Sequence, residues 1–89
     1  MAILAALFAA AALVVGSPEY GFATVEIEGP PGAELHIDGR PVTIFDAEGR
    51  VLLQLSAETH RLTVKRGRKV LESRDVEFGA GSRIHLEMW

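Results

Sequence analysis

The chain of 89 residues carries 12 acidic and 9 basic side chains, a formal net charge of -3 at neutral pH, and no cysteine. This length suits one small domain. The negative charge argues against general nucleic-acid binding, which needs a surplus of cations to neutralise phosphates. Without cysteine, neither a disulfide framework nor a thiolate metal site is available.

The first eighteen residues form an apolar segment without a charged side chain. As a helix this segment would rise roughly 27 Å, close to the ~30 Å hydrocarbon core of a bilayer. We therefore expect residues 1–18 to be a retained transmembrane helix or uncleaved signal anchor. The side chains expected to face lipid are Ala2, Ile3, Leu4, Leu7, Phe8, Leu13, Val14 and Val15.

A secretory leader is the alternative interpretation of this apolar segment. Leaders have an apolar core of about 7–15 residues before a small-residue cleavage site, and Gly21-Phe22-Ala23 would place cleavage before Thr24. Because the positive amino terminus favours the inner side of the membrane, both interpretations place residues 24–89 on the periplasmic or extracytoplasmic side. Residues 19–23 are then a linker, in which Tyr20 and Phe22 can serve as interfacial aromatic residues.

From residue 24 onward, short runs of alternating apolar and polar residues are separated by turn residues. This period of two predicts strands over residues 24–28, 33–38, 42–45, 50–55, 60–65, 70–78 and 83–89. The residues expected to point inward are Val25, Ile27, Ala33, Leu35, Ile37, Val51, Leu53, Leu55, Leu62, Val64, Val76, Phe78, Ile84, Leu86 and Met88. Polar residues in the middle of the 70–78 strand indicate a bulge there.

Seven short strands with one apolar face each predict an all-β domain, a small antiparallel β-sandwich of Ig-like form. A closed small barrel is the alternative architecture. Two turns are the most specific signals: Pro30, Pro31 and Gly32 force a change of direction, and Asp38-Gly39 is typical of a tight hairpin.

Residues 30–33 (Pro-Pro-Gly-Ala), followed by the Asp38-Gly39 turn, resemble the motif that gives the PEGA domain its name. Residues 60–64 are similar to the histidine-led strand of that family, and residues 76–79 with 84–86 are similar to its closing hairpin. The resemblance implies that residues 24–89 are an extracytoplasmic or membrane-tethered β-sandwich. It also implies a non-catalytic interaction or envelope-associated module, so no catalytic residue is carried over.

The chain departs from the family pattern at two places. Pro31 stands where the family has Glu, and residues 42–45 stand where it usually has a Gly-x-Thr-Pro segment. The second departure affects the register of the third predicted strand.

No constellation of residues predicts a reaction centre. The three histidines, His36, His60 and His85, are not spaced as convergent metal ligands, so no metal site is expected. His36 is expected at a solvated surface, His60 as a hydrogen-bonded structural residue, and His85 as an exposed cross-strand partner. No serine lies in a nucleophile elbow, and we expect no enzymatic activity, cofactor or small-molecule substrate.

One cluster of charge remains. Lys65, Arg66, Arg68 and Lys69 lie in a single predicted hairpin turn. They are either solvated charges that discourage edge aggregation or a contact with anionic lipid headgroups, a cell-wall polymer or an acidic protein patch. Trp89 is a further candidate interface residue.

These features predict a non-enzymatic, membrane-anchored accessory or structural subunit. Its exported domain would contact protein partners of a larger membrane or envelope complex. The alternative is a secreted module, with residues 1–23 removed, that binds cell-wall or surface glycan. A row of exposed aromatic residues would favour that alternative, and after Phe22 the candidates are Phe45, Phe78 and Trp89.

Overall fold

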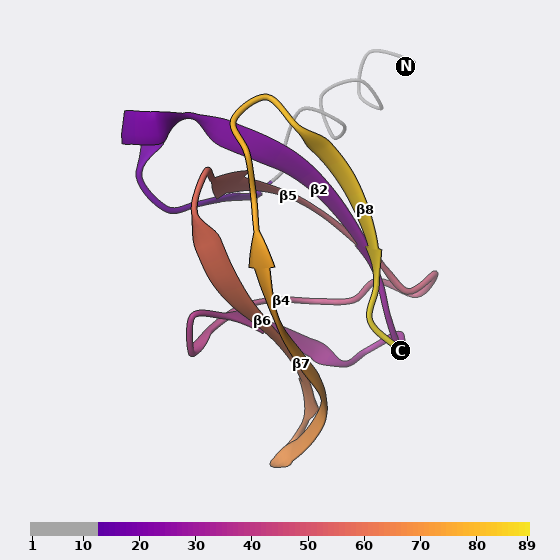
Figure 1. Cartoon of the computed structure of the whole chain (residues 1–89). Helices are drawn as coiled ribbons and strands as arrows, with labels where there is room; N and C mark the ends of the chain where they lie inside the picture. Colours follow the sequence, from indigo (N-terminus) through magenta and orange to yellow (C-terminus); the bar gives the residue numbers. More distant parts are fainter. Residues whose placement is uncertain (1–12) are drawn as a thin grey trace.

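In a computed structural model, which describes residues 13–89, the chain forms two four-stranded sheets (Figure 1). The first sheet contains, in spatial order, β1 (Leu13–Val15), β5 (Arg50–Ser56), β2 (Phe22–Glu28) and β8 (Arg83–Glu87). The second sheet contains β4 (Arg40–Ile44), β3 (Glu34–Ile37), β6 (Thr59–Arg66) and β7 (Lys69–Glu77). The predicted all-β class is confirmed, and all seven strands expected after residue 24 form.

Cross-strand register places apolar residues side by side on the inner face of each sheet. Val25 of β2 lies between Leu53 of β5 and Ile84 of β8. In the second sheet, Leu35 of β3 lies opposite Val64 of β6. Most neighbouring strands are antiparallel, while β1 with β5 and β2 with β8 are parallel.

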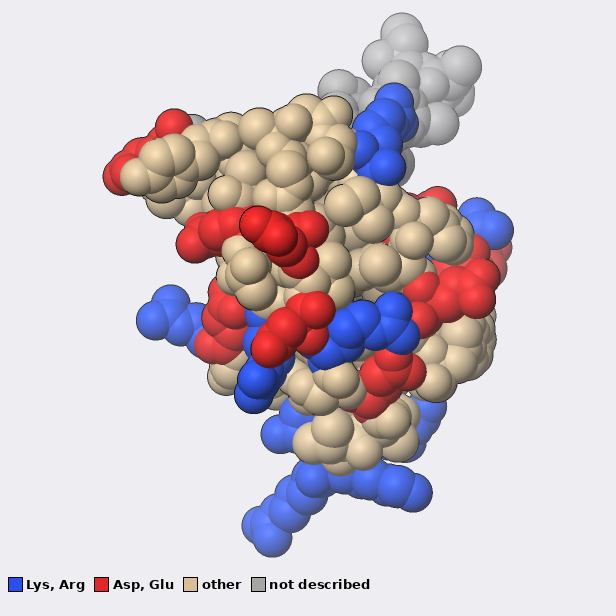
Figure 2. Space-filling model, in the orientation of Figure 1, with Lys and Arg blue, Asp and Glu red and all other residues tan. Residues whose placement is uncertain are grey.

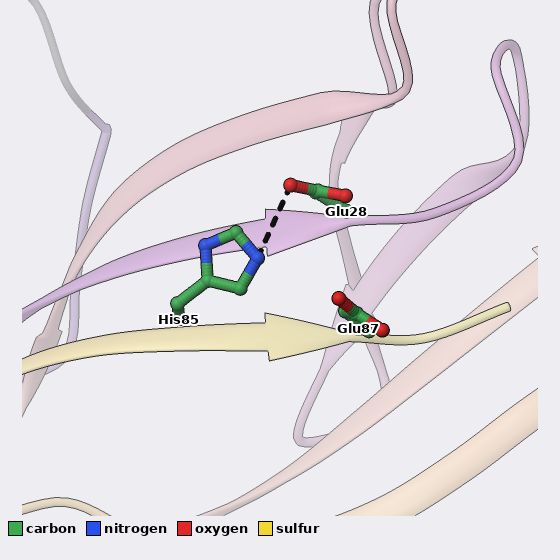
Figure 3. Close-up of side chains that lie close together, drawn as sticks. All are labelled: Glu28, His85 and Glu87. Atoms are coloured by element: carbon green, nitrogen blue, oxygen red, sulfur yellow. Dashed lines mark ion pairs between the residues drawn. The ribbon is translucent and has the colours of Figure 1, made fainter.

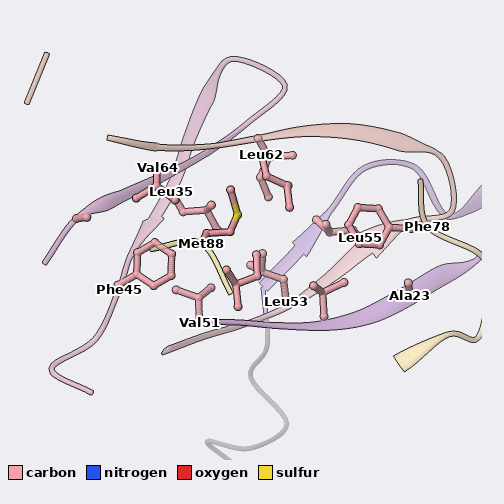
Figure 4. Close-up of a cluster of buried hydrophobic side chains, with 14 residues drawn as sticks. Ala23, Leu35, Phe45, Val51, Leu53, Leu55, Leu62, Val64, Phe78 and Met88 are labelled. Atoms are coloured by element: carbon pink, nitrogen blue, oxygen red, sulfur yellow. The ribbon is translucent and has the colours of Figure 1, made fainter. Parts of the chain in front are cut away.

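The inner faces of the two sheets supply one hydrophobic core (Figure 4). Its buried residues are Ala23, Val25, Ile27, Ala33, Leu35, Ile37, Phe45, Val51, Leu53, Leu55, Leu62, Val64, Phe78 and Met88. Val76, Ile84 and Leu86, also expected inside, are half-buried because β7 and β8 are edge strands. Phe45 is also a core residue, although the alternation of apolar and polar residues did not predict it.

The apolar amino-terminal segment differs from the expected helix where the structure describes it. Leu13–Val15 is a strand, β1, paired in parallel with Leu53, Gln54 and Leu55 of β5. Two β-branched valines suit an extended conformation, and Gly16, with φ +100°, ends the strand. Within residues 13–89 no helix has the length and apolar character needed to span a bilayer.

The remaining expected lipid-facing residues, Ala2, Ile3, Leu4, Leu7 and Phe8, lie outside the described residues. The expected linker also differs from the structure. A short 3-10 helix, η1 (Pro18–Tyr20), leads directly into β2, which begins at Phe22. Ala23 is fully buried in the core, so a leader ending before Thr24 would remove residues that belong to the first sheet.

The two predicted turns form with the geometry that their sequence requires. Gly32 has φ +81°, and the Ala33 N–H donates to Pro30 O at 3.1 Å, as in a type II turn. Asp38 (φ +53°) and Gly39 (φ +83°) occupy the two central positions of the β3–β4 hairpin, which is the type I′ pattern.

Two bulges adjust the second sheet. In β7 the extra residue is Leu71, because Val64 pairs with Glu72 and the next residue, Lys65, pairs with Val70. The expected bulge therefore exists but lies near the start of β7, not in its middle. The other bulge is in β4, at the edge of the sheet, where Pro41 is tolerated because its outer side needs no ladder hydrogen bond.

Gly49 offers a direct test of this packing. The Gly29 N–H donates to Gly49 O at 2.8 Å, and a Cβ on Gly49 (φ +77°) would lie 2.4 Å from Gly29 O. Gly39→Ala is the matched control, since Gly39 also has positive φ but no atom within 4 Å of its Cβ position. We expect Gly49→Ala to lower the free energy of unfolding by about 1–2 kcal/mol more than Gly39→Ala does. Urea unfolding followed by circular dichroism measures this, and equal losses would contradict the packing.

Candidate functional site

His60, on β6, is a buried polar residue that connects the two sheets. Its side chain is 3% exposed and Ser56, at the end of β5, is 2% exposed. His60 Nδ1 lies 2.6 Å from Asp38 Oδ2, and Nε2 lies 3.0 Å from both the Oγ and the backbone oxygen of Ser56. The expected hydrogen bonding of His60 is confirmed, and its partners come from the β3–β4 turn and from the other sheet.

Ser56, His60 and Asp38 share the connectivity of a hydrolytic triad, but their surroundings favour a structural role. The Ser56 hydroxyl donates to Glu58 Oε2, so it meets His60 Nε2 as an acceptor and is not poised to lose a proton to the ring. The backbone of Gly16 also covers this hydroxyl, because a Cβ on Gly16 would lie 2.0 Å from Ser56 Oγ. A substrate carbonyl therefore has no approach to the hydroxyl in this conformation.

Asp38 fixes the tip of the β3–β4 hairpin against β6. Its backbone N–H donates to Arg61 O at 2.8 Å, and its Oδ1 accepts the Arg61 N–H at 2.9 Å. Partial burial alone would raise the pKa of Asp38. The hydrogen bonds from the Arg61 N–H and from His60, together with the charge of His60, outweigh this effect and hold the pKa below its ordinary value of 3.8.

The Asp38 carboxylate should stabilise the fold in a pH-dependent way. Because its pKa is lowered in the folded state, the stabilisation is present above pH 3.8 and is lost as the pH falls through the folded pKa. Asp38→Asn keeps the side-chain shape and tolerates positive φ. At pH 7 we expect it to lower the free energy of unfolding by about 1 kcal/mol, a modest value because Asp38 is half exposed.

Urea unfolding at pH 7 and below about pH 3 measures this dependence, and the wild-type and Asp38→Asn midpoints should converge at the lower pH. Asp75→Asn is the control for an exposed ion pair, since Asp75 pairs with Arg61 on the exposed face at 2.8 Å. The hydrogen bond from Arg61 lowers the pKa of Asp75 too, so we expect this variant to show a smaller gap at pH 7 that also closes at low pH. A gap between wild type and Asp38→Asn that is equal at both pH values would contradict the assignment.

A second group of titratable side chains lies on the outer face of the first sheet (Figure 3). His85 of β8 has Nδ1 3.1 Å from Glu26 Oε1 and Nε2 3.1 Å from Glu28 Oε2, both on β2. The expected exposed cross-strand partner is confirmed. Its acidic partners lie almost sixty positions earlier in the chain, so the sequence did not reveal them.

Glu87 completes this group, since it lies opposite Glu28 in the parallel β2–β8 pair. One ligand atom from each of Glu28, His85 and Glu87 falls within 4.8 Å of the others, so among the described residues this group has the spacing needed to contact one cation. The ion pair between His85 and Glu28 accounts for the arrangement of these two side chains. Next to them, Thr24, Leu52 and Arg83 help to line a shallow groove of about 310 Å³.

The basic hairpin, defined by Lys65, Arg66, Arg68 and Lys69, is brought together as the sequence predicted. The β6–β7 turn extends beyond the body of the molecule (Figure 1), and Figure 2 shows Lys and Arg side chains spread around that end. Within residues 13–89, none of these four side chains forms an ion pair with a carboxylate. The Arg66 guanidinium instead donates to Pro31 O at 3.4 Å.

Exposed aliphatic residues lie beside this hairpin. Lys65 pairs with Val70 on one side and with Glu34 on the other, and Glu34 pairs with Ile44. These four residues form a row across the outer face of the second sheet. Ile44 is 59% exposed and Val70 is 53% exposed.

The candidate aromatic interface residues are not gathered in one place. Tyr20 and Phe22 lie at the start of β2, whereas Trp89 follows Met88, whose N–H donates to Glu28 O at the other end of that strand. Tyr20 and Trp89 are exposed and Phe22 is half-buried. Phe45 and Phe78 are core residues, so they cannot contribute to an exposed aromatic row for glycan binding.

Comparison of the chain with models of known protein families and with curated protein sequences finds no match.

Proposed function

We propose that this chain is a non-enzymatic interaction module whose basic hairpin contacts an anionic partner in a membrane or envelope assembly. The observation that supports this proposal is the concentration of basic residues in the hairpin, while acidic residues predominate in the rest of the chain. Four of the nine Lys and Arg residues lie in residues 65–69, which leaves five for the rest of the chain against twelve Asp and Glu. Anions are attracted to the hairpin and repelled by the rest of the surface.

The hairpin is also positioned to act at short range. Screening in physiological salt limits charge interactions to about 8 Å, so cations at an extended tip act on a partner that touches them. A rigid strand supports the tip, because β6 is held by β3 on one side and by β7 on the other.

We also propose a finer assignment of the fold. On the basis of the turn motif of residues 30–39, we assign the domain as a PEGA-like, extracytoplasmic β-sandwich.

Neutralising the hairpin should weaken the association with partners. We expect Arg66→Gln/Arg68→Gln to lose most of the protein or anionic lipid that co-purifies with wild type from native membranes in mild detergent. Arg40→Gln/Arg50→Gln is the matched control, since it changes the net charge equally, and these two exposed arginines make no side-chain ion pair within residues 13–89. Equal partner recovery with both double variants would contradict the proposal.

We further propose that the apolar residues before β1 hold the domain at the membrane, with the β domain on the periplasmic side. The test is deletion of residues 2–12, which leaves β1 and the cover of Ser56 by Gly16 intact. A deletion to residue 18 would also remove an edge strand of the first sheet and confuse the result. After a wash in 0.5 M salt, which screens the charges of the hairpin, we expect the full chain in the membrane fraction and the shortened chain in the soluble fraction; equal sedimentation of the two would exclude this anchor.

A further inference from the structure

The shape of the hairpin tip indicates which kind of partner the basic hairpin contacts. Arg66, Arg68, Lys69 and Val70 are all exposed, and Gly67 at the turn has no atom within 4 Å of its Cβ position. The tip is therefore convex, and residues 65–70 contain no aromatic side chain. Specific protein partners are usually held by aromatic and arginine anchors seated in pockets. A convex tip of flexible point charges instead suits a surface that requires no fixed register.

Aliphatic side chains next to the cations point to the same kind of surface. Val70 and Ile44 lie in one row with Lys65, and both are more than half exposed. Cations beside aliphatic residues are typical of elements that lie in the headgroup region of a bilayer. Glu34, the one acid in that row, is half-buried and is bonded to His36 Nε2 at 2.9 Å, so its charge is partly engaged.

The charge on the rest of the molecule would orient it on an anionic surface. Beyond the hairpin, acidic residues outnumber basic residues by more than two to one. The nearest carboxylate along β7, that of Glu72, is paired with Arg74. An anionic surface therefore attracts the hairpin end and repels the faces that carry Glu26, Glu28 and Glu87.

We propose that the basic hairpin docks on a bilayer surface containing anionic lipid, with the side chains of Val70 and Ile44 at the headgroup level. This inference rests on the function proposed above and names the chemical class of the partner. Each Lys or Arg near an anionic bilayer contributes a roughly fivefold gain in partitioning. The contact should be stronger than a single charge pair, because it involves the four cations of the hairpin and the aliphatic side chains of Val70 and Ile44.

The test is sedimentation of the full chain with vesicles of phosphatidylglycerol and phosphatidylcholine, compared with pure phosphatidylcholine vesicles. An apolar anchor partitions into both, so the anionic preference isolates the contribution of the hairpin. We expect Arg66→Gln/Arg68→Gln to reduce that preference roughly thirtyfold, and 0.5 M salt to abolish it in wild type. Arg40→Gln/Arg50→Gln should retain it.

A further variant separates a lipid surface from a specific protein site. Arg66→Lys/Arg68→Lys keeps the point charges but removes the planar guanidinium forks, so it should bind anionic vesicles within about threefold of wild type. Loss equal to that of the glutamine variant, or no preference of wild type for anionic vesicles, would overturn the lipid inference. If wild type then still co-purifies with a protein that Arg66→Gln/Arg68→Gln loses, the proposed function stands with a protein partner.

Discussion

The hydrogen bonds of His60 are the constraint on which the rest of this structure depends. One imidazole, buried between two sheets, joins the β3–β4 turn through Asp38 to the end of β5 through Ser56. Leaving such a buried polar group without partners would cost on the order of 1–3 kcal/mol, a large fraction of the stability of a domain this small. The side chain therefore ties both sheets together through its hydrogen bonds to Asp38 and Ser56.

The contacts of His60 also hold the strand that leads into the basic hairpin. His60 is the second residue of β6, and the basic hairpin begins at Lys65, roughly 17 Å farther along the same strand. β1 pairs in parallel with Leu53, Gln54 and Leu55 of β5, next to Ser56.

How far the sequence predicts this structure depends on whether a feature is local. The period-two alternation identified the strands and most of the core, because burial of one sheet face leaves that pattern in every strand. Asp38-Gly39 predicted its hairpin because few residues adopt positive φ. In contrast, β1 lies in a uniformly apolar run and pairs with residues forty positions away, so nothing local distinguishes it from a helix. The Glu26–His85 pair was missed for the same reason, since parallel register is not encoded by neighbouring residues.

A residue-resolved NMR titration of the full chain with anionic and zwitterionic bicelles would show directly which residues contact lipid. We expect amide signals of residues 65–70 and of Ile44 to shift or broaden with anionic bicelles alone. The signals of Glu26 and His85 on the outer face of the first sheet should stay unchanged. Changes centred on Glu26 and His85, or equal changes at the hairpin with both lipids, would contradict the claim that isolated cations on the hairpin make the contact.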